Sequence, residues 1–256
     1  MLISSVPVSL GTIVALEAQT DSSLARAYQE IQAEVRSAPV KNTDETGWRE
    51  RGLRNWLWMA ATDTAALFRI HPKRGFAALQ GLLGKKIEGV IGSDRWTAYN
   101  QLDLKNRQFC WAHLKRDFQK LVDRAGPAES VGRAGLEIVG CLFADWHEFR
   151  EGLIDREKLR ARMERTRLEL QFESELDRRS PDKKVARFCN NLLTLYPALW
   201  WFVEVEGVEP TNNHAERGLR PCMLWRKSSF GHQSLNGKKF AERMMSVTQT
   251  LKLRNQ

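Results

Sequence analysis

The sequence predicts an α/β protein in which a long helical segment interrupts a core of strands and helices. Three observations lead to this fold class. Residues 38–72 hold three short stretches rich in β-branched and aromatic residues, separated by turn-forming residues, as in antiparallel strands. Residues 74–118 then alternate between helix-like and strand-like patterns. Residues 119–205 lose the strand pattern and place apolar residues at helical spacing.

Helices are expected at the start of the chain. Residues 21–37 form an amphipathic pattern, with Asp21 or Ser22 as the expected N-cap and an apolar stripe of Leu24, Tyr28, Ile31 and Val35. Residues 8–16 have the length and small-residue content of a separate short helix after a turn. This helix could be the end of a helix-turn-helix.

The elements that follow define the expected core. Three antiparallel strands are predicted at "APVKNTDETGW" (38–48), "NWLWMAATD" (55–63) and "AALFRIHP" (65–72). A helix closed by Gly84 (74–84), a buried strand (87–94), a short helix (95–102) and a strand running into a helix (107–118) come next. This order is that of a ribonuclease-H-like core, a mixed five-stranded sheet with flanking helices.

The interrupting segment is predicted to be all helical. Residues 135–149 place four apolar side chains on one helical face, and residues 150–184 are so rich in both charge signs that we expect an exposed helix or helical hairpin. The expected domains are therefore an N-terminal helical segment (1–37), the first part of the core (38–118), a helical insertion (119–205) and the last part of the core (206–256).

Composition and charge narrow the class of partner. Hydrophobic residues make up 42% and charged residues 28% of the 256, as in a folded globular protein. The formal net charge of +9 favours a polyanion, nucleic acid first and an anionic membrane surface second. The four cysteines are scattered without a CxxC pair, which suits a reducing cytoplasm, and no apolar run is long enough to span a membrane.

Three acids stand out by their positions. Asp44 lies within the first predicted strand, Asp94 ends the fourth, and Glu216 opens a helix that Asn212 or Asn213 could cap. In the expected topology these carboxylates could meet at one point. Converging carboxylates repel one another unless a cation neutralises them, and oxygen ligands select Mg²⁺, with Mn²⁺ as a substitute.

Each of these acids could equally have a purely local role. An Asp at a strand end is often a turn residue, and the helix dipole alone favours a Glu in the first turn. Glu45, Asp63 and Asp103 are rival acids that spacing does not exclude.

A basic segment without acids follows Glu216. Between residues 217 and 241 it holds six cations and no carboxylate, which suits a surface for backbone phosphates. These candidate DNA-binding residues are Arg217, Arg220, Arg226, Lys227, Lys238 and Lys239.

Five motif blocks resemble, in order, those of bacterial insertion-sequence transposases of the type-sixty-six family. They are "DETGW", "SDRWTAYN", "CWAHLKRDF", "NNHAERGLRP" and "RKSSFGHQSLNGKKFAERMMSVTQTLK", and the likeness covers residues 5–254. The resemblance implies a DDE enzyme in which Asp44, Asp94 and Glu216 hold the divalent metal. It further implies hydrolysis at transposon ends to give 3′-hydroxyls, followed by their attack on target DNA.

The same resemblance implies the setting of the protein. The expected partner is double-stranded DNA, both transposon ends and target, in the bacterial cytoplasm near the nucleoid, with a homo-oligomer on DNA and no membrane. Family members usually carry a longer N-terminal part with helix-turn-helix and coiled-coil character, and "VSLGTIVALEAQ" resembles its end. The alternative is therefore a truncated, catalytically silent DNA-binding remnant or inhibitor of transposition.

For further residues, the sequence leaves both a structural role and a binding role open. Cys110 and His113 have CxxH spacing but no second pair at zinc-finger distance, which favours packing over zinc binding. Trp48 and Trp225 lie near the acidic and basic motifs and are candidates for stacking on a displaced base, with packing as the alternative. The loop around His232 could face DNA or be an ordinary turn.

Overall fold

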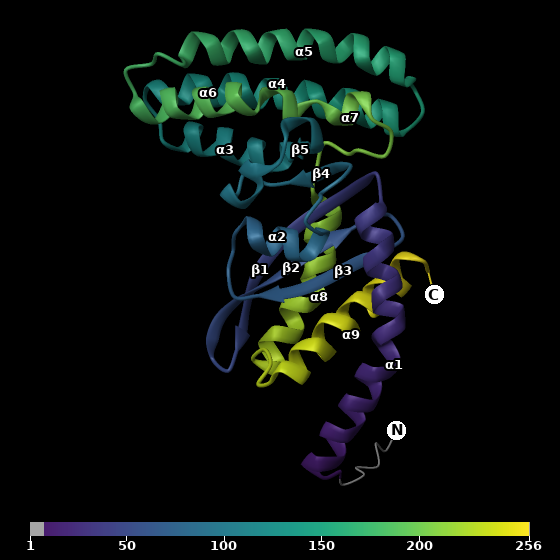
Figure 1. The fold of residues 1–256 in the computed structure, drawn as a ribbon. Coiled ribbons are helices and arrows are strands. Elements are labelled where there is room, and N and C mark those ends of the chain that lie inside the picture. Colours follow the sequence, from purple (N-terminus) through teal and green to yellow (C-terminus); the bar gives the residue numbers. More distant parts are fainter. Residues whose placement is uncertain (1–7, 256) are drawn as a thin grey trace, which may run out of the picture. The chain divides into compact units, whose positions relative to one another are not determined.

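The computed structural model describes residues 8–255 and divides the chain into two compact units (Figure 1). The first unit combines Met1–Gly89 with Asn213–Gln256, and the second is the continuous stretch Val90–Asn212. The first unit has three consecutive strands with helices before and after them along the chain, whereas the second unit is mainly helical. Five strands occur in the described residues, some antiparallel and some parallel, so the predicted α/β class is confirmed.

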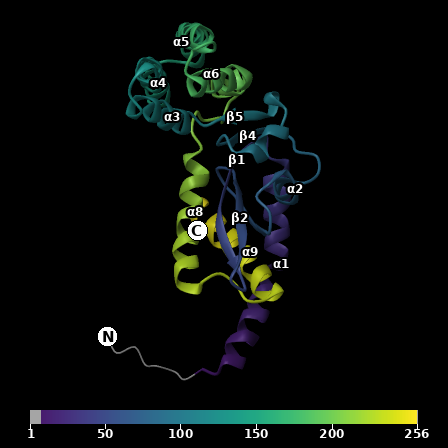
Figure 2. The same ribbon diagram turned by 90° about the vertical axis from the view of Figure 1, so that its left-hand side faces the viewer.

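An antiparallel sheet forms the centre of the first unit. Its strands are β1 (Val40–Glu50), β2 (Leu53–Ala61) and β3 (Ala66–His71), with β2 in the middle. Helices α8 (Asn213–Ser229) and α9 (Leu235–Leu253) cover one face, and Figure 2 shows α8 and α2 (Phe76–Leu83) on opposite sides of the sheet. The three predicted strands and the helix closed by Gly84 are confirmed.

Side chains of α9 bond to the outer edge of β3. The backbone N–H groups of Ala66, Phe68 and Ile70 donate to side-chain oxygens spaced four residues apart on α9, at 2.7–3.0 Å: Thr250, Ser246 and Glu242 respectively. Burial raises the pKa of the Glu242 carboxyl. Because an open strand edge is a template for aggregation, this contact both closes the sheet and fixes α9 along it.

Helix α1 (Leu10–Ser37) corrects the prediction for the N-terminal segment. A break near residue 20 and an N-cap at Asp21 or Ser22 were wrong, because one helix begins after Ser9, whose hydroxyl accepts the Thr12 N–H. Asp21 instead pairs with Arg243 of α9 at 2.7 Å. The acid that resembles a cap in the sequence therefore makes a tertiary ion pair.

The second unit begins with a short parallel pair of strands. β4 (Val90–Ser93) lies beside β5 (Arg107–Phe109), and α3 (Trp111–Asp123) follows β5 as predicted. Between the strands are two 3₁₀ turns, Thr97–Gln101 and Leu104–Asn106. The helix predicted over 95–102 is thus a shorter and tighter 3₁₀ segment.

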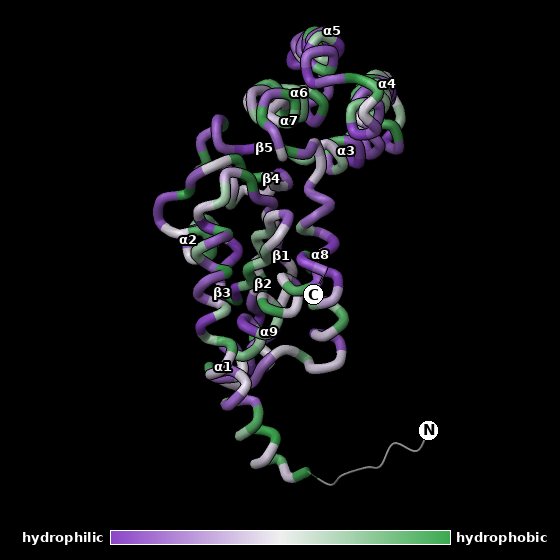
Figure 3. Tube along the Cα trace, turned by 90° about the vertical axis from the view of Figure 1, so that its right-hand side faces the viewer, coloured by the Kyte–Doolittle hydropathy of each residue, from purple (hydrophilic) through white to green (hydrophobic). Residues whose placement is uncertain are grey.

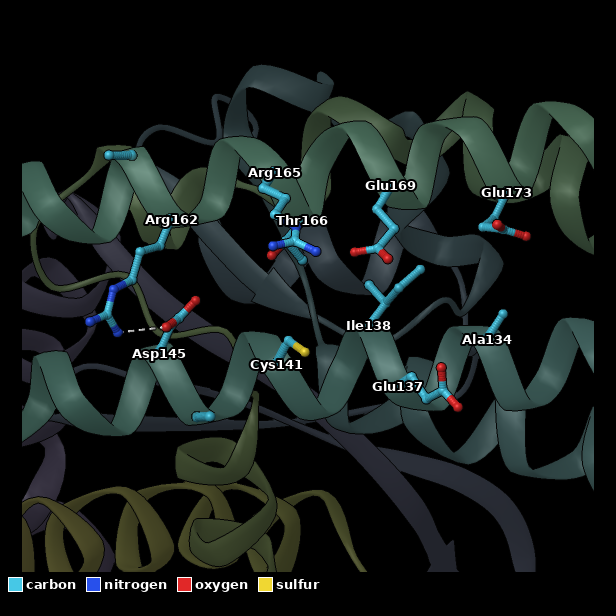
Figure 4. A pocket seen from close by; sticks show the side chains of 12 residues that line it. Ala134, Glu137, Ile138, Cys141, Asp145, Arg162, Arg165, Thr166, Glu169 and Glu173 are labelled. Carbon is cyan, nitrogen blue, oxygen red and sulfur yellow. Dashed lines mark hydrogen bonds and ion pairs between the residues drawn. The ribbon is translucent and has the colours of Figure 1, made fainter.

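The remaining helices pack in sequence. They are α4 (Pro127–Arg150), α5 (Arg156–Asp177), α6 (Lys183–Leu195) and α7 (Trp201–Glu204), with a 3₁₀ turn at Tyr196–Leu199. Charged residues dominate α5, whose trace is largely hydrophilic in Figure 3. Arg162 of α5 donates to Asp145 of α4 (Figure 4) and also to Glu148 of the same helix. These helices confirm the predicted helical content of residues 119–205.

None of the helices in the described part of the chain is both long and apolar enough to cross a membrane.

Candidate active site

Asp44 lies on the face of the sheet that α8 covers. Alternation along β1 puts its side chain on the same face as Trp48, and its cross-strand partner is Met59 of β2. Trp48 and Met59 pack with Leu219 and Cys222 of α8 in one hydrophobic cluster. Asp44 itself is half-buried, and one of its carboxylate oxygens accepts the Glu45 backbone N–H at 2.8 Å.

Glu216 stands in the first turn of α8, above the same end of the sheet. A Cβ added to Gly218 would lie 2.1 Å from the Met59 methyl, so the helix backbone passes directly over the cross-strand partner of Asp44. Nε2 of His214 lies 2.8 Å from the carbonyl of Thr62, just after β2. Glu216 is half-buried, between the buried Ala215 and the exposed Arg217. Asp44 and Glu216 therefore share one face of the first unit.

The rival acids of the first unit have other surroundings. Glu45 points to the opposite face and bonds to Arg74 at 2.8 Å, a distance typical of a structural ion pair. Asp63 is exposed in the turn between β2 and β3.

Asp94 belongs to the second unit and directly follows β4. Its Oδ1 accepts the Trp96 backbone N–H at 2.8 Å, which fixes the turn after the strand. It remains half-buried. The rival Asp103 has a local role, because it caps a 3₁₀ turn by accepting the Lys105 N–H at 2.9 Å.

Arg107 lies beside Asp94 and was not predicted from the sequence. Its guanidinium is fully buried and donates to four neutral acceptors: Ser93 Oγ, Asn100 Oδ1 and the carbonyls of Asp94 and Tyr99. Burial lowers its pKa to about 10, although the charge of Asp94 opposes that shift. The available signal was an arginine at the first position of a strand expected in the core, since an arginine is rarely buried without a specific role.

The six candidate DNA-binding residues differ in exposure. Arg217, Arg220 and Lys227 lie on the outer side of α8 and are exposed, as is Lys239 of α9. Lys238 is half-buried. Arg226 is also half-buried and turns toward the sheet, where it donates to the Gly47 carbonyl. Four of the six are thus placed to meet a large anion, and Arg226 has a structural contact as well.

Two other groups of residues now have defined environments. Trp48 is 2% exposed and donates to His232 at 2.9 Å, so the hypothesis that Trp48 stacks on a base is wrong. Trp225 is only half-buried, edge-on to Trp48. Cys110 is buried ahead of α3, and its sulfur accepts the Asn212 N–H. All four cysteines are free thiols.

Comparison with known proteins identifies the family. No curated protein matches the chain closely enough to count as a relative. The family model described as "Transposase IS66 family" matches residues 3–239 of the 256. The match includes Asp44, Asp94 and Glu216 with the elements that carry them. The chain therefore belongs to the IS66 family of transposases.

Proposed function

We propose that the protein is a DDE-type DNA transposase with a ribonuclease-H-like catalytic core and a helical insertion. Membership of a transposase family supports a reaction on DNA. The observation that carries the catalytic assignment is the placement of Asp44 and Glu216 on one face of the first unit, with Met59 and Gly218 in contact between their elements. Asp94, at the end of a buried strand, is proposed as the third carboxylate.

The donor set fits a hard divalent cation. All three side chains are half-buried and offer carboxylate oxygens. Because these ligands are carboxylates, metal binding requires no removal of thiol or imidazole protons. We propose that Asp44, Asp94 and Glu216 together hold two Mg²⁺ ions, for which Mn²⁺ can substitute. When bound, the metal would supply Lewis-acid stabilisation of the charge that develops during phosphodiester displacement.

The exposed cations have a separate role in this proposal. Arg217 and Arg220 follow Glu216 by one and four positions on α8, so phosphates gripped there would lie next to the carboxylate. Lys227 and Lys239 extend the basic surface, and Lys238 and Arg226 contribute charge from half-buried positions. The proposed substrates are the two transposon ends and a target duplex, brought together by at least two copies of the chain.

Nicking of supercoiled plasmid in Mn²⁺ tests the assignment without knowledge of the terminal sequences. We expect the wild-type chain to nick, and Glu216→Gln to lose about 100-fold or more of the rate while binding DNA normally, because a metal ligand is lost and the shape is kept. Asp63→Asn is the matched control, since it removes an exposed carboxylate of the same unit. Its rate should equal that of the wild type.

Two results would reject the catalytic assignment. If Glu216→Gln and Asp63→Asn nick equally well, Glu216 is not a ligand of the reacting metal. If no variant nicks although each binds DNA with wild-type affinity, the chain is a DNA-binding remnant.

A further inference from the structure

A pocket of about 800 Å³ opens in the second unit, next to Asp94 in the sequence. One wall is the segment after β4, from Arg95 to Arg107, and the other is α6. The pocket is lined by six α6 side chains that recur at spacings of three and four residues and so share one face of the helix: Lys184, Arg187, Phe188, Asn191, Thr194 and Leu195. The pocket is therefore built by two elements of one compact unit.

The lining of this pocket is selectively basic. The second unit as a whole has twenty Lys or Arg residues and twenty Asp or Glu residues, so it carries no net charge. The pocket nonetheless has four cations and no carboxylate among its lining residues, namely Arg95, Arg107, Lys184 and Arg187. The groove between α4 and α5 shows the contrast, because there Arg162 and Arg165 alternate with acids (Figure 4).

The positive charges of these four side chains are neutralised by neighbouring carboxylates to different degrees. Arg95 pairs with Asp117 of α3, which neutralises it. Arg107 is buried and bonds only to neutral oxygens. Lys184 and Arg187 are exposed, and no carboxylate in residues 8–255 lies within ion-pair distance of either. The positive potential of the pocket is thus strongest along α6, where an anion could displace water from both side chains.

Flat and amide-bearing side chains complete the pocket. Trp96 lines the wall opposite α6, and its backbone is fixed by the bond to Asp94. Asn100 and Asn191 offer amides that can both donate and accept, and Asn100 is already oriented by Arg107. A ring for stacking, amides for a base edge and two unpaired cations together match the parts of a nucleotide.

We propose that this pocket binds an unpaired nucleotide of a DNA strand. Lys184 and Arg187 hold its backbone phosphates, and the base lies against Trp96. A single nucleotide fits within 800 Å³. Because Asp94 directly precedes the lining residue Arg95, the rest of the strand would pass next to Asp94. The identity of the strand as DNA rests on the proposed function, whereas the preference for an unpaired nucleotide follows from the pocket itself.

Fluorescence anisotropy with a labelled ten-nucleotide single strand tests this site. EDTA is present, so that binding is measured apart from cleavage. We expect Lys184→Gln/Arg187→Gln to weaken binding about tenfold. The slope of the logarithm of the binding constant against the logarithm of the salt concentration should fall in magnitude by about 1.4, since each phosphate contact on a single strand contributes ~0.7 to it. The matched control is Lys158→Gln/Arg165→Gln, which removes two exposed cations from α5. It should keep wild-type affinity and slope.

An abasic strand of the same length separates the base from the phosphate. Trp96→Leu should weaken binding of the normal strand about tenfold and leave binding of the abasic strand unchanged, because only a base can stack. Trp96→Tyr keeps a ring and should retain most of the affinity, which also shows that a change at this position leaves the fold intact.

Three outcomes would overturn the proposal. If the α6 and α5 double variants lose the same affinity for the single strand, binding depends only on the overall charge of the protein. Equal effects of Trp96→Leu on both strands would leave a phosphate site without a base. A loss for a blunt duplex as large as for the single strand would remove the preference for unpaired DNA. Because no metal is present, failure of the plasmid-nicking test does not affect these results.

Discussion

The imidazole of His232 joins two parts of the first unit that are far apart in the sequence. The Trp48 indole N–H donates to its Nδ1 at 2.9 Å, and its Nε2 lies 3.5 Å from a Glu50 oxygen, at the limit of a hydrogen bond. The backbone of His232 also bonds to Arg49 and Arg51 at the end of β1. Because Nδ1 accepts a bond, the ring must be neutral, with its proton on Nε2.

The free energy of unfolding should therefore depend on the charge state of His232. Burial lowers the pKa of the imidazole below its usual value; the Glu50 carboxylate opposes this shift, and Lys238 adds to it. A base with a lowered folded-state pKa contributes its full stability above the unfolded pKa of about 6.5 and loses it as the pH falls further. Stability should thus drop below about pH 6.5, as the unfolded chain takes up the proton first.

Urea denaturation between pH 7.5 and 5.5 measures this effect. His232→Asn keeps an acceptor for Trp48 but cannot titrate, so its stability should fall less with pH than that of the wild type. His71→Asn, at a histidine whose ring bonds to the Lys73 backbone and is exposed to solvent there, should keep the wild-type slope. His232→Leu should cost about 1–3 kcal/mol at pH 7.5, because the buried indole N–H loses its acceptor. Identical slopes for the wild type and His232→Asn would contradict this account.

At the residue scale, the sequence predicted in which helix or strand a residue lies better than it predicted which side chains that residue contacts. Asp44 lies within a strand and Glu216 in the first turn of a helix, as the local patterns indicated. The burial of Trp48 against His232 depends on a contact between residues 184 apart, which no local pattern reports. Arg107 was missed for the same reason, since its four acceptors lie at the end of β4 and in the segment that follows it.

At the element scale, helices α3 and α4 approach each other more closely than ordinary side chains would permit. A Cβ added to Gly132 would lie 2.7 Å from the backbone oxygen of Phe118 and the backbone nitrogen of Val122, and one added to Gly135 would lie 2.2 Å from the Phe118 ring. Backbone atoms cannot move aside as a flexible side chain can. These glycines therefore set the separation of the two helices.

Substitution of Gly132 by alanine should force α3 and α4 apart. We expect Gly132→Ala to lower the free energy of unfolding by about 1–3 kcal/mol, the usual cost of overpacking, or by more. Gly140→Ala is the control in the same helix, because a Cβ there meets nothing within 4 Å. It should stabilise by up to about 1 kcal/mol through helix propensity alone. Denaturant unfolding, monitored by circular dichroism, gives the free energy of unfolding of both variants. Equal free energies for Gly132→Ala and Gly140→Ala would show that the close approach of the helices is absent.

The predicted elements succeeded where local periodicity and tertiary structure agree. The strands β1–β3 and the helices α2 and α3 match their patterns because each buries the face that its sequence marks as apolar. The predicted break in α1 failed because Asp21 is satisfied by Arg243, on a helix near the other end of the chain. Likewise, the bonds from β3 to α9 could not be foreseen, since threonine and serine inside a helix have no distinctive local signature.

At the scale of the whole molecule, the two units divide the charge unequally. The first unit has twenty basic and eleven acidic residues, and the second has twenty of each, so the net charge of +9 belongs to the first unit alone. Asp44, Glu216 and the basic segment after Glu216 are all in the first unit. Non-specific attraction of a polyanion should therefore act mainly on that unit, whereas the second offers a local basic pocket.

The units also differ in how the chain builds them. The second is one continuous stretch with its own buried residues, among them Trp111, Phe118 and Leu142. The first needs both ends of the chain, because α8 and α9 cover a sheet made by residues 40–71. A fragment of residues 90–212 should therefore fold by itself, and a fragment of residues 1–89 should not.

Circular dichroism and denaturant titration of the two fragments test this expectation. The 90–212 fragment should be strongly helical and unfold in one cooperative transition, which Gly132→Ala moves to lower denaturant. The 1–89 fragment is the control, since without α8 and α9 it exposes Leu57, Met59 and Phe68, which are buried in the whole protein. It should aggregate or unfold without a transition. A non-cooperative 90–212 fragment would mean that its core depends on the rest of the chain.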